Sequence, residues 1–204
     1  PLIYYAKDFL QLKDFNILKK KLGKVLLLFP SHSVKHEKLN MNVDDFINKC
    51  TSLLDNYDTI MVCLYWSDIK NFAHLYINKG FKVVSAGNLN DVNFMFRLKT
   101  IIKLSDYVVT DVVGTHVGYC ICLNKVVWII PGNTILANLV EPYKRFQKFD
   151  YHDNVIEELS MIKKVFENPQ SYISESQKNI IDDFWGLNNI KSAKELNEIL
   201  SGKT

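Results

Sequence analysis

The sequence predicts an α/β fold: a Rossmann-like parallel sheet of five strands in the order 3-2-1-4-5, flanked by helices and followed by a helical C-terminal tail. The first observation is that short runs, apolar on both faces, recur at helix-sized intervals, which is typical of strands buried in a parallel sheet. The second is that the intervals carry apolar residues at helical spacing. The chain has 204 residues, 48% of them hydrophobic, and can therefore bury a sizeable core.

The expected strands are the five apolar runs. They span residues 25–29, 59–65, 82–86, 107–112 and 125–130. Helices are expected between them, over residues 44–54, 68–78 and 92–104, with a short helix over residues 117–123 before the fifth strand. This alternation of strand and helix is typical of a doubly wound sheet.

The chain divides into three expected parts. Residues 1–24 have too little apolar periodicity for a domain and form an N-terminal lead-in segment, whereas residues 25–150 form the Rossmann-like domain. Residues 151–204 show helical runs without clear strands and are expected to pack on that domain. Within them, Ser192 and Glu195 have the spacing of a capping box that begins the last helix.

Composition excludes several classes of protein. No apolar run approaches the roughly 20 residues of a membrane-spanning helix, and no signal segment opens the sequence. The net charge of +3 is too small to indicate a nucleic-acid-binding protein. Four lysines between Lys19 and Lys24 are interpreted as a solvated helix end, with contact to anionic lipid or to a phosphate as the alternative.

The cysteines and histidines do not suggest a metal site. The four cysteines lie on apolar segments and form no CxxC pair, and no HExxH motif is present. Reduced thiols packed as small hydrophobic groups indicate a reducing compartment, so a cytoplasmic location is expected.

Two polar loops mark the expected ligand site. In an open parallel sheet, ligands bind at the carboxyl ends of the strands where the strand order reverses, here between the first and fourth strands. Residues 30–33 follow the first strand, and residues 113–118 follow the fourth. Both loops are rich in Ser, Thr, His and Gly, so a site between them is predicted.

The loop after the fourth strand has the composition of a small anion site. Gly114 and Gly118 permit close approach of a phosphate, and the helix that follows would offer its free N-terminal amides, including those of Thr115 and Val117. The alternative is that the two glycines serve only tight packing of strand and helix. Because the chain has 2 Arg, bidentate guanidinium contacts are scarce, and backbone amides, Lys, His and hydroxyl groups are expected to hold the anion.

Two histidines and one tryptophan complete the set of candidates. His32 and His116 lie in the two loops and are candidate catalytic residues that could donate to a phosphate or supply a proton to a leaving group. Hydrogen-bonded structural histidines are the alternative. Trp66 follows the second strand and could stack on a base or sugar, or pack as an ordinary buried aromatic residue.

These residues resemble a known family. The runs 105–111, 114–119 and 123–127 look like the donor-side motif of GT-B-fold glycosyltransferases, in which a buried strand leads into a small-residue turn and a helix. The run Phe29-Pro30-Ser31-His32-Ser33 is similar to the first-strand loop of bacterial capsule and O-antigen biosynthesis proteins. The segment Phe184-Trp185-Gly186 also looks like the tail of such proteins.

The resemblance implies the donor-binding, C-terminal half of a glycosyltransferase of surface-polysaccharide assembly, acting at the inner face of the membrane. The phosphates of a nucleotide-sugar would lie on the amides of residues 114–118, with Ser31, His32 and Ser33 opposite. Glu141 is a candidate for the carboxylate that binds the ribose.

Such an enzyme would need no metal and no further cofactor. Its partners would be a nucleotide-sugar donor, a saccharide acceptor, and a second GT-B domain or another copy of the chain. The alternative is a non-catalytic Rossmann-like module that binds a nucleotide or a protein partner, because the sequence supplies strands for one sheet.

Overall fold

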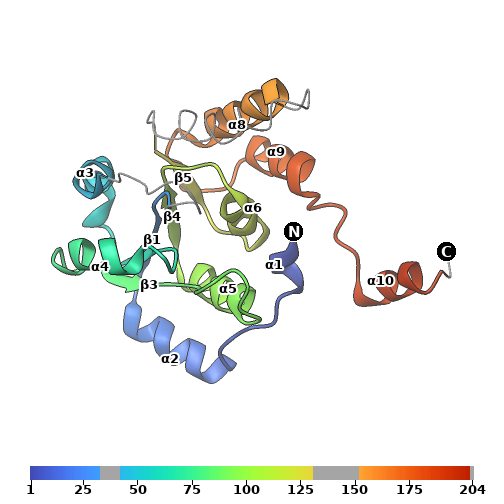
Figure 1. Cartoon of the computed structure of the whole chain (residues 1–204), viewed down its shortest axis with the longest axis horizontal. Coiled ribbons are helices and arrows are strands. Elements are labelled where there is room, and N and C mark those ends of the chain that lie inside the picture. The colour runs from blue at the N-terminus through green and yellow to red at the C-terminus, as the bar shows by residue number, and fades with distance from the viewer. Residues whose placement is uncertain (33–41, 131–151, 203–204) are drawn as a thin grey trace.

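A computed structural model describes residues 1–32, 42–130 and 152–202 (Figure 1). The strands are β1 (Val25–Phe29), β2 (Thr59–Cys63), β3 (Lys82–Val84), β4 (Tyr107–Thr110) and β5 (Val127–Ile129). The helices are α1 (Leu2–Tyr5), α2 (Leu12–Leu22), α3 (Val43–Leu54), α4 (Ile69–Ile77), α5 (Phe94–Leu104), α6 (Thr115–Cys122), α8 (His152–Phe166), α9 (Glu175–Trp185) and α10 (Ala193–Leu200). Among the described helices, none is both long and apolar enough to cross a membrane.

The five strands form one parallel sheet in the order β3-β2-β1-β4-β5. This confirms the predicted fold class and strand order. In the register between the two central strands, Phe29 of β1 lies opposite Thr110 of β4. Both strands therefore end at the same level, and the loops that follow them start side by side.

The central strand β1 is buried on both faces of the sheet. Leu26 and Leu28 pack toward α3 and α4, whereas Leu27 and Phe29 pack toward α5 and α6. Figure 1 shows these pairs of helices on opposite sides of the sheet. Each leucine side chain that is fully buried in this way stabilises the fold by about 1.5–3 kcal/mol, which is why this strand carries apolar residues without alternation.

Four strands are shorter than predicted, because apolar residues at their ends leave the sheet. β5 spans Val127–Ile129 instead of residues 125–130. β2 ends at Cys63 and β4 at Thr110, and β3 has three residues. Leu64 and Val113 remain buried beyond the strand ends. Their apolar side chains close the core beneath the loops instead of extending the strands.

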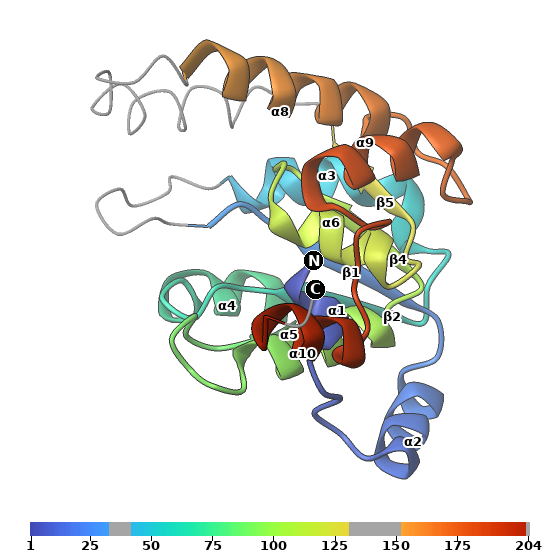
Figure 2. The same ribbon diagram turned by 90° about the vertical axis from the view of Figure 1, so that its right-hand side faces the viewer.

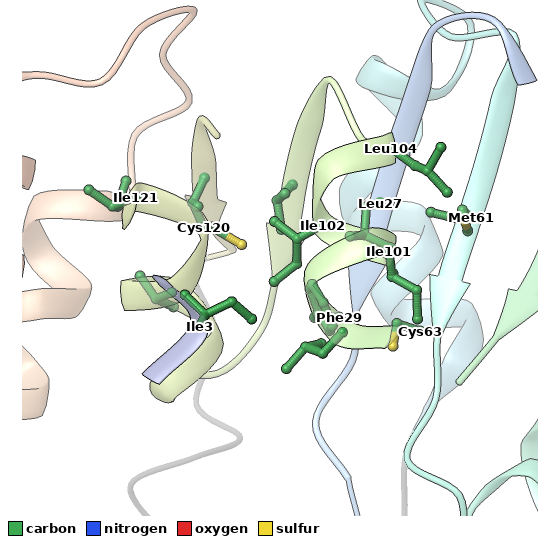
Figure 3. Close-up of a cluster of buried hydrophobic side chains, with 14 of the residues drawn as sticks. Ile3, Leu27, Phe29, Met61, Cys63, Ile101, Ile102, Leu104, Cys120 and Ile121 are labelled. Carbon is green, nitrogen blue, oxygen red and sulfur yellow. The ribbon is translucent and has the colours of Figure 1, made fainter. Parts of the chain in front are cut away.

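The N-terminal lead-in segment contributes to the core. It forms α1 and α2, and Ile3 of α1 is fully buried. Figure 3 shows Ile3 beside Cys120 and Ile121 of α6, with Ile102 of α5 nearby. The apolar periodicity of this segment was too short to predict that contact from sequence.

The C-terminal helices differ in how they are held. α8 and α9 lie side by side next to β5 and α6 (Figures 1 and 2). α10 extends away from the sheet and has no buried residue (Figure 1). Its predicted capping box is confirmed, because the hydroxyl of Ser192 accepts from the Glu195 amide and the Glu195 carboxylate accepts from the Ser192 amide.

Gly118 sits in the middle of α6, where α9 packs against it. A Cβ atom at this position would lie 2.8 Å from Cδ2 of Trp185. Since Gly118 itself is buried, the missing side chain is what allows the indole ring to rest on the helix backbone.

We predict that Gly118→Ala lowers stability only while Trp185 is present. Overpacking costs about 1–3 kcal/mol, which exceeds the gain of about 1 kcal/mol that alanine brings to a helix. In a Trp185→Ala background the clash is absent, so the same substitution should leave stability unchanged or raise it. Urea denaturation of the four proteins measures both effects. An equal loss in the two backgrounds would show that Trp185 is not the reason for the glycine.

Candidate functional site

The candidate site lies at the carboxyl ends of β1 and β4. The chain continues from β1 to β2 on one side and from β4 to β5 on the other, so the two central strands flank the point at which the strand order reverses. Residues 30–32 and 111–114 meet there. The structure therefore confirms the predicted neighbourhood of the two loops.

One half-buried carboxylate, that of Asp111, joins the two loops. Oδ1 of Asp111 accepts from the amide of Ser31 at 2.7 Å, and Oδ2 accepts from the Ser31 hydroxyl at 2.9 Å. Both donor groups of Ser31 are used in this way. Ser31 thus connects the two loops, and the ligand contact expected of it stays a prediction.

Asp111 itself was not among the predicted site residues. Burial raises the pKa of its carboxyl group, and the hydrogen bonds from Ser31 counteract part of that rise. The Asp111 charge also contributes, after burial, to the raised pKa values of Cys50 and Tyr76. Those residues lie on α3 and α4, so the carboxylate faces that side of the sheet.

His116 lies on the opposite side of β4, over the α5 and α6 layer. Its Nε2 atom is 3.0 Å from Oγ1 of Thr110, and its ring centroid is 5.1 Å from that of Phe29. The ring is half-buried. Burial, with a smaller contribution from the charge of His32, lowers the pKa of His116 to about 4. The imidazole is therefore neutral at pH 7.

The helix after β4 begins two residues earlier than predicted, with Gly114 as its N-cap and Thr115 as its first residue. The amide of Val117 already bonds to the Gly114 carbonyl at 2.9 Å. By helix geometry, the amides of Thr115 and His116 have no acceptor within the helix. In open α/β sheets the ligand crevice lies outside the carboxyl ends of the strands at the point where the strand order reverses. These two amides lie at that point, next to Gly114.

Two predicted phosphate contacts lie inside the fold. Val117 is fully buried in the core, and Gly118 lies beneath Trp185. Gly118 therefore serves packing, which is the alternative that the sequence left open. The packing is between helices α6 and α9, whereas the sequence suggested packing of a strand against a helix. Of the residues predicted to lie at the start of this helix, Gly114, Thr115 and His116 are the ones that do.

Aromatic rings line the side of the crevice toward β2. The exposed His32 ring lies 4.9 Å from Tyr65, centroid to centroid, and the Tyr65 ring lies 6.1 Å from Trp66. Trp66 is 46% exposed, so its role is not that of a buried core residue. The three rings form an aromatic row beside the loop after β1, in which His32 and Trp66 are exposed and Tyr65 is half-buried.

Two predicted contacts, Ser33 and Glu141, lie outside the described residues. Within the part of the chain that the structure describes, no group of three or more His, Cys, Asp or Glu side chains could hold a metal ion. The four cysteines are free thiols.

No protein-family model matches the sequence, and no curated protein matches it. Among solved structures, that of the wall teichoic acid polymerase TagF is similar, with a TM-score of 0.43 and 15% sequence identity. The similarity covers 92% of this chain and 45% of that one. The chain thus spans less than half the length of the polymerase, and a similarity at this level leaves its function open.

We predict that Asp111→Ala is more destabilising than Ser31→Ala. Loss of the carboxylate leaves two Ser31 donors without their acceptor, at a cost of about 1–3 kcal/mol, whereas loss of the hydroxyl removes one hydrogen bond worth about 0.5–1.5 kcal/mol. Urea denaturation at pH 7 measures the order. Asp183→Ala, at an exposed position, is the control. If Asp111→Ala were as mild as the control, the carboxylate would not join the loops.

We also predict that His116 makes the fold less stable in acid. The unfolded chain protonates this histidine near pH 6.5 and the folded chain near pH 4, so its contribution to stability is complete above about pH 6.5 and declines as the pH falls toward 4. His116→Gln should reduce this decline in stability. His74→Gln, at an exposed helix position, should leave it unchanged. Urea midpoints at several pH values test this, and an equal decline in all three proteins would contradict it.

Proposed function

We propose that the crevice between β1 and β4 binds the phosphate-bearing part of a nucleotide-sugar, and that the chain is the donor-binding half of a GT-B-like glycosyltransferase of surface-polysaccharide assembly. The observation that carries this proposal is the position of the α6 N-terminus. It opens with Gly114 at the point where the strand order reverses, which is where α/β proteins bind phosphates.

The chemistry of the crevice favours anion binding through the backbone. Residues 30–32 and 111–114 contain no Lys or Arg. Arg97 donates to the Ala86 carbonyl and pairs with Asp91, so its guanidinium is used within the fold. The amides of Thr115 and His116, together with the positive end of the helix dipole, are then the groups available for a phosphate.

The acidic group of the crevice does not oppose such a ligand directly. Asp111 faces the side of α3 and α4, and its two oxygens accept hydrogen bonds from Ser31. The α6 N-terminus lies on the other side of β4. A phosphate on this helix is therefore separated from the carboxylate by the end of the strand.

The aromatic row supplies the second part of a nucleotide-sugar site. Trp66 and Tyr65 offer ring faces on which a base or sugar can stack. His32, the member of this row whose charge acts on His116, is the proposed proton donor to the departing phosphate. Helix amides and such a donor stabilise a leaving phosphate without a metal ion.

The second candidate is a non-catalytic module that binds a nucleotide or a protein partner. It is favoured by the single sheet in the described part of the chain, because glycosyl transfer in a GT-B-like enzyme needs a second domain to place the saccharide acceptor. Transfer from a labelled donor, measured with this chain alone and with a separate acceptor domain, distinguishes the two candidates. Under the first candidate, activity appears only when the second domain is added.

The test of the proposal is a thermal-shift screen of nucleoside diphosphates and their sugars. A ligand at 100 times its dissociation constant should stabilise the fold by about 2.7 kcal/mol. Gly114→Val should abolish the shift while circular dichroism remains native, because the new Cβ would lie 3.0 Å from His116 Nδ1 and cover the amides. His32→Ala should weaken binding, and His74→Ala should have no effect. Equal shifts for wild type and Gly114→Val would place the ligand elsewhere.

A further inference from the structure

The two edges of the His116 ring have different surroundings. The Nε2 edge contacts the Thr110 hydroxyl at 3.0 Å. The other edge faces Gly114, where an added Cβ would lie 3.0 Å from Nδ1 and 3.1 Å from Cε1. Within the described residues, Nδ1 has no hydrogen bond.

The backbone conformation does not explain the glycine at this position. Gly114 has φ −159° and ψ 176°, an extended conformation that any residue can adopt. A side chain there would cover the Nδ1 edge of His116. The glycine therefore leaves this edge uncovered, next to the free amides of α6.

The hydrogen bonds of the Thr110 hydroxyl determine which ring nitrogen of His116 carries the proton. Its hydroxyl is fully buried and accepts from the Val112 amide at 3.2 Å. The single hydroxyl proton can go either to His116 Nε2 at 3.0 Å or to the Val112 carbonyl at 3.2 Å. In the first case the neutral imidazole carries its proton on Nδ1, and in the second on Nε2.

The distances favour the first arrangement. A hydroxyl usually donates to a carbonyl oxygen at about 2.5–3.0 Å, so 3.2 Å is long for a bond to Val112. A ligand oxyanion at the start of α6 adds to this preference, because it binds an Nδ1 proton and would be repelled by an Nδ1 lone pair.

We propose that Thr110 is a positioning residue that donates to Nε2 of His116, so that Nδ1–H points over Gly114 as a neutral donor to a ligand oxygen. The ligand in this inference is the phosphate of the proposed function. The pKa of about 4 for His116 agrees with a neutral donor across the physiological range. Thr110 then sets the tautomer of His116, and His116 donates the hydrogen bond. Gly114 leaves the Nδ1 edge of the ring uncovered.

The tautomer can be measured in the ligand-free chain by nitrogen NMR of the histidine rings at pH 7. The wild type should show a neutral His116 with its proton on Nδ1. Thr110→Val keeps the shape of the side chain without the hydroxyl and should give a mixture of tautomers, whereas Thr110→Ser should retain the wild-type state. His74 is the internal control and should not change. A proton on Nε2 in the wild type, or the same state in Thr110→Val, would overturn the proposal.

Binding of pyrophosphate, measured by calorimetry, tests whether Thr110 acts through His116. Thr110→Val and His116→Ala should each weaken binding about three- to tenfold, the worth of one hydrogen bond. In the His116→Ala background, Thr110→Val should cause no further loss. A further loss there would contradict a positioning role. If pyrophosphate does not bind the wild type, the proposed function is wrong, while the tautomer of the ligand-free chain still decides the role of Thr110.

Discussion

The arrangement of the loops after β1 and β4 depends on the two hydrogen bonds that Ser31 donates to Asp111. They join the ends of two strands that are far apart in sequence, and they fix the relative position of the loops that form the crevice. The cost of burying a carboxyl group is seen in its raised pKa. The hydrogen bonds from Ser31 offset part of this cost. They also hold the two loops in one relative position.

The end of β4 separates two kinds of chemistry. Successive residues of a strand point to opposite faces, so Asp111 faces α3 and α4 while Thr110 faces α5 and α6. The Asp111 carboxylate therefore accepts hydrogen bonds from Ser31 on one side. The neutral His116 lies on the other side, in the first turn of α6. A shift of the β4 register by one residue would exchange these neighbours.

The fold could be predicted from sequence because burial dictates it. β1 has the predicted bounds, since a run that is apolar on both faces has one stable environment in an α/β protein. For the candidate site, the sequence predicted which two loops lie next to each other but not the contacts between them. The contacts that assign roles, Asp111 with Ser31 and Gly118 with Trp185, join residues far apart in the chain, and no local pattern encodes them. The start of α6 was missed because its first residues carry no apolar periodicity.

The central claim is that a phosphate binds at the start of α6, and the most direct measurement is the change in amide chemical shifts when a nucleoside diphosphate is added to the labelled chain. The account predicts the largest shifts at Gly114, Thr115 and His116, with smaller shifts at Trp66 and at His32. Saturating shifts that leave α6 unchanged and cluster elsewhere in the chain, for example beside α2 or α10, would contradict it.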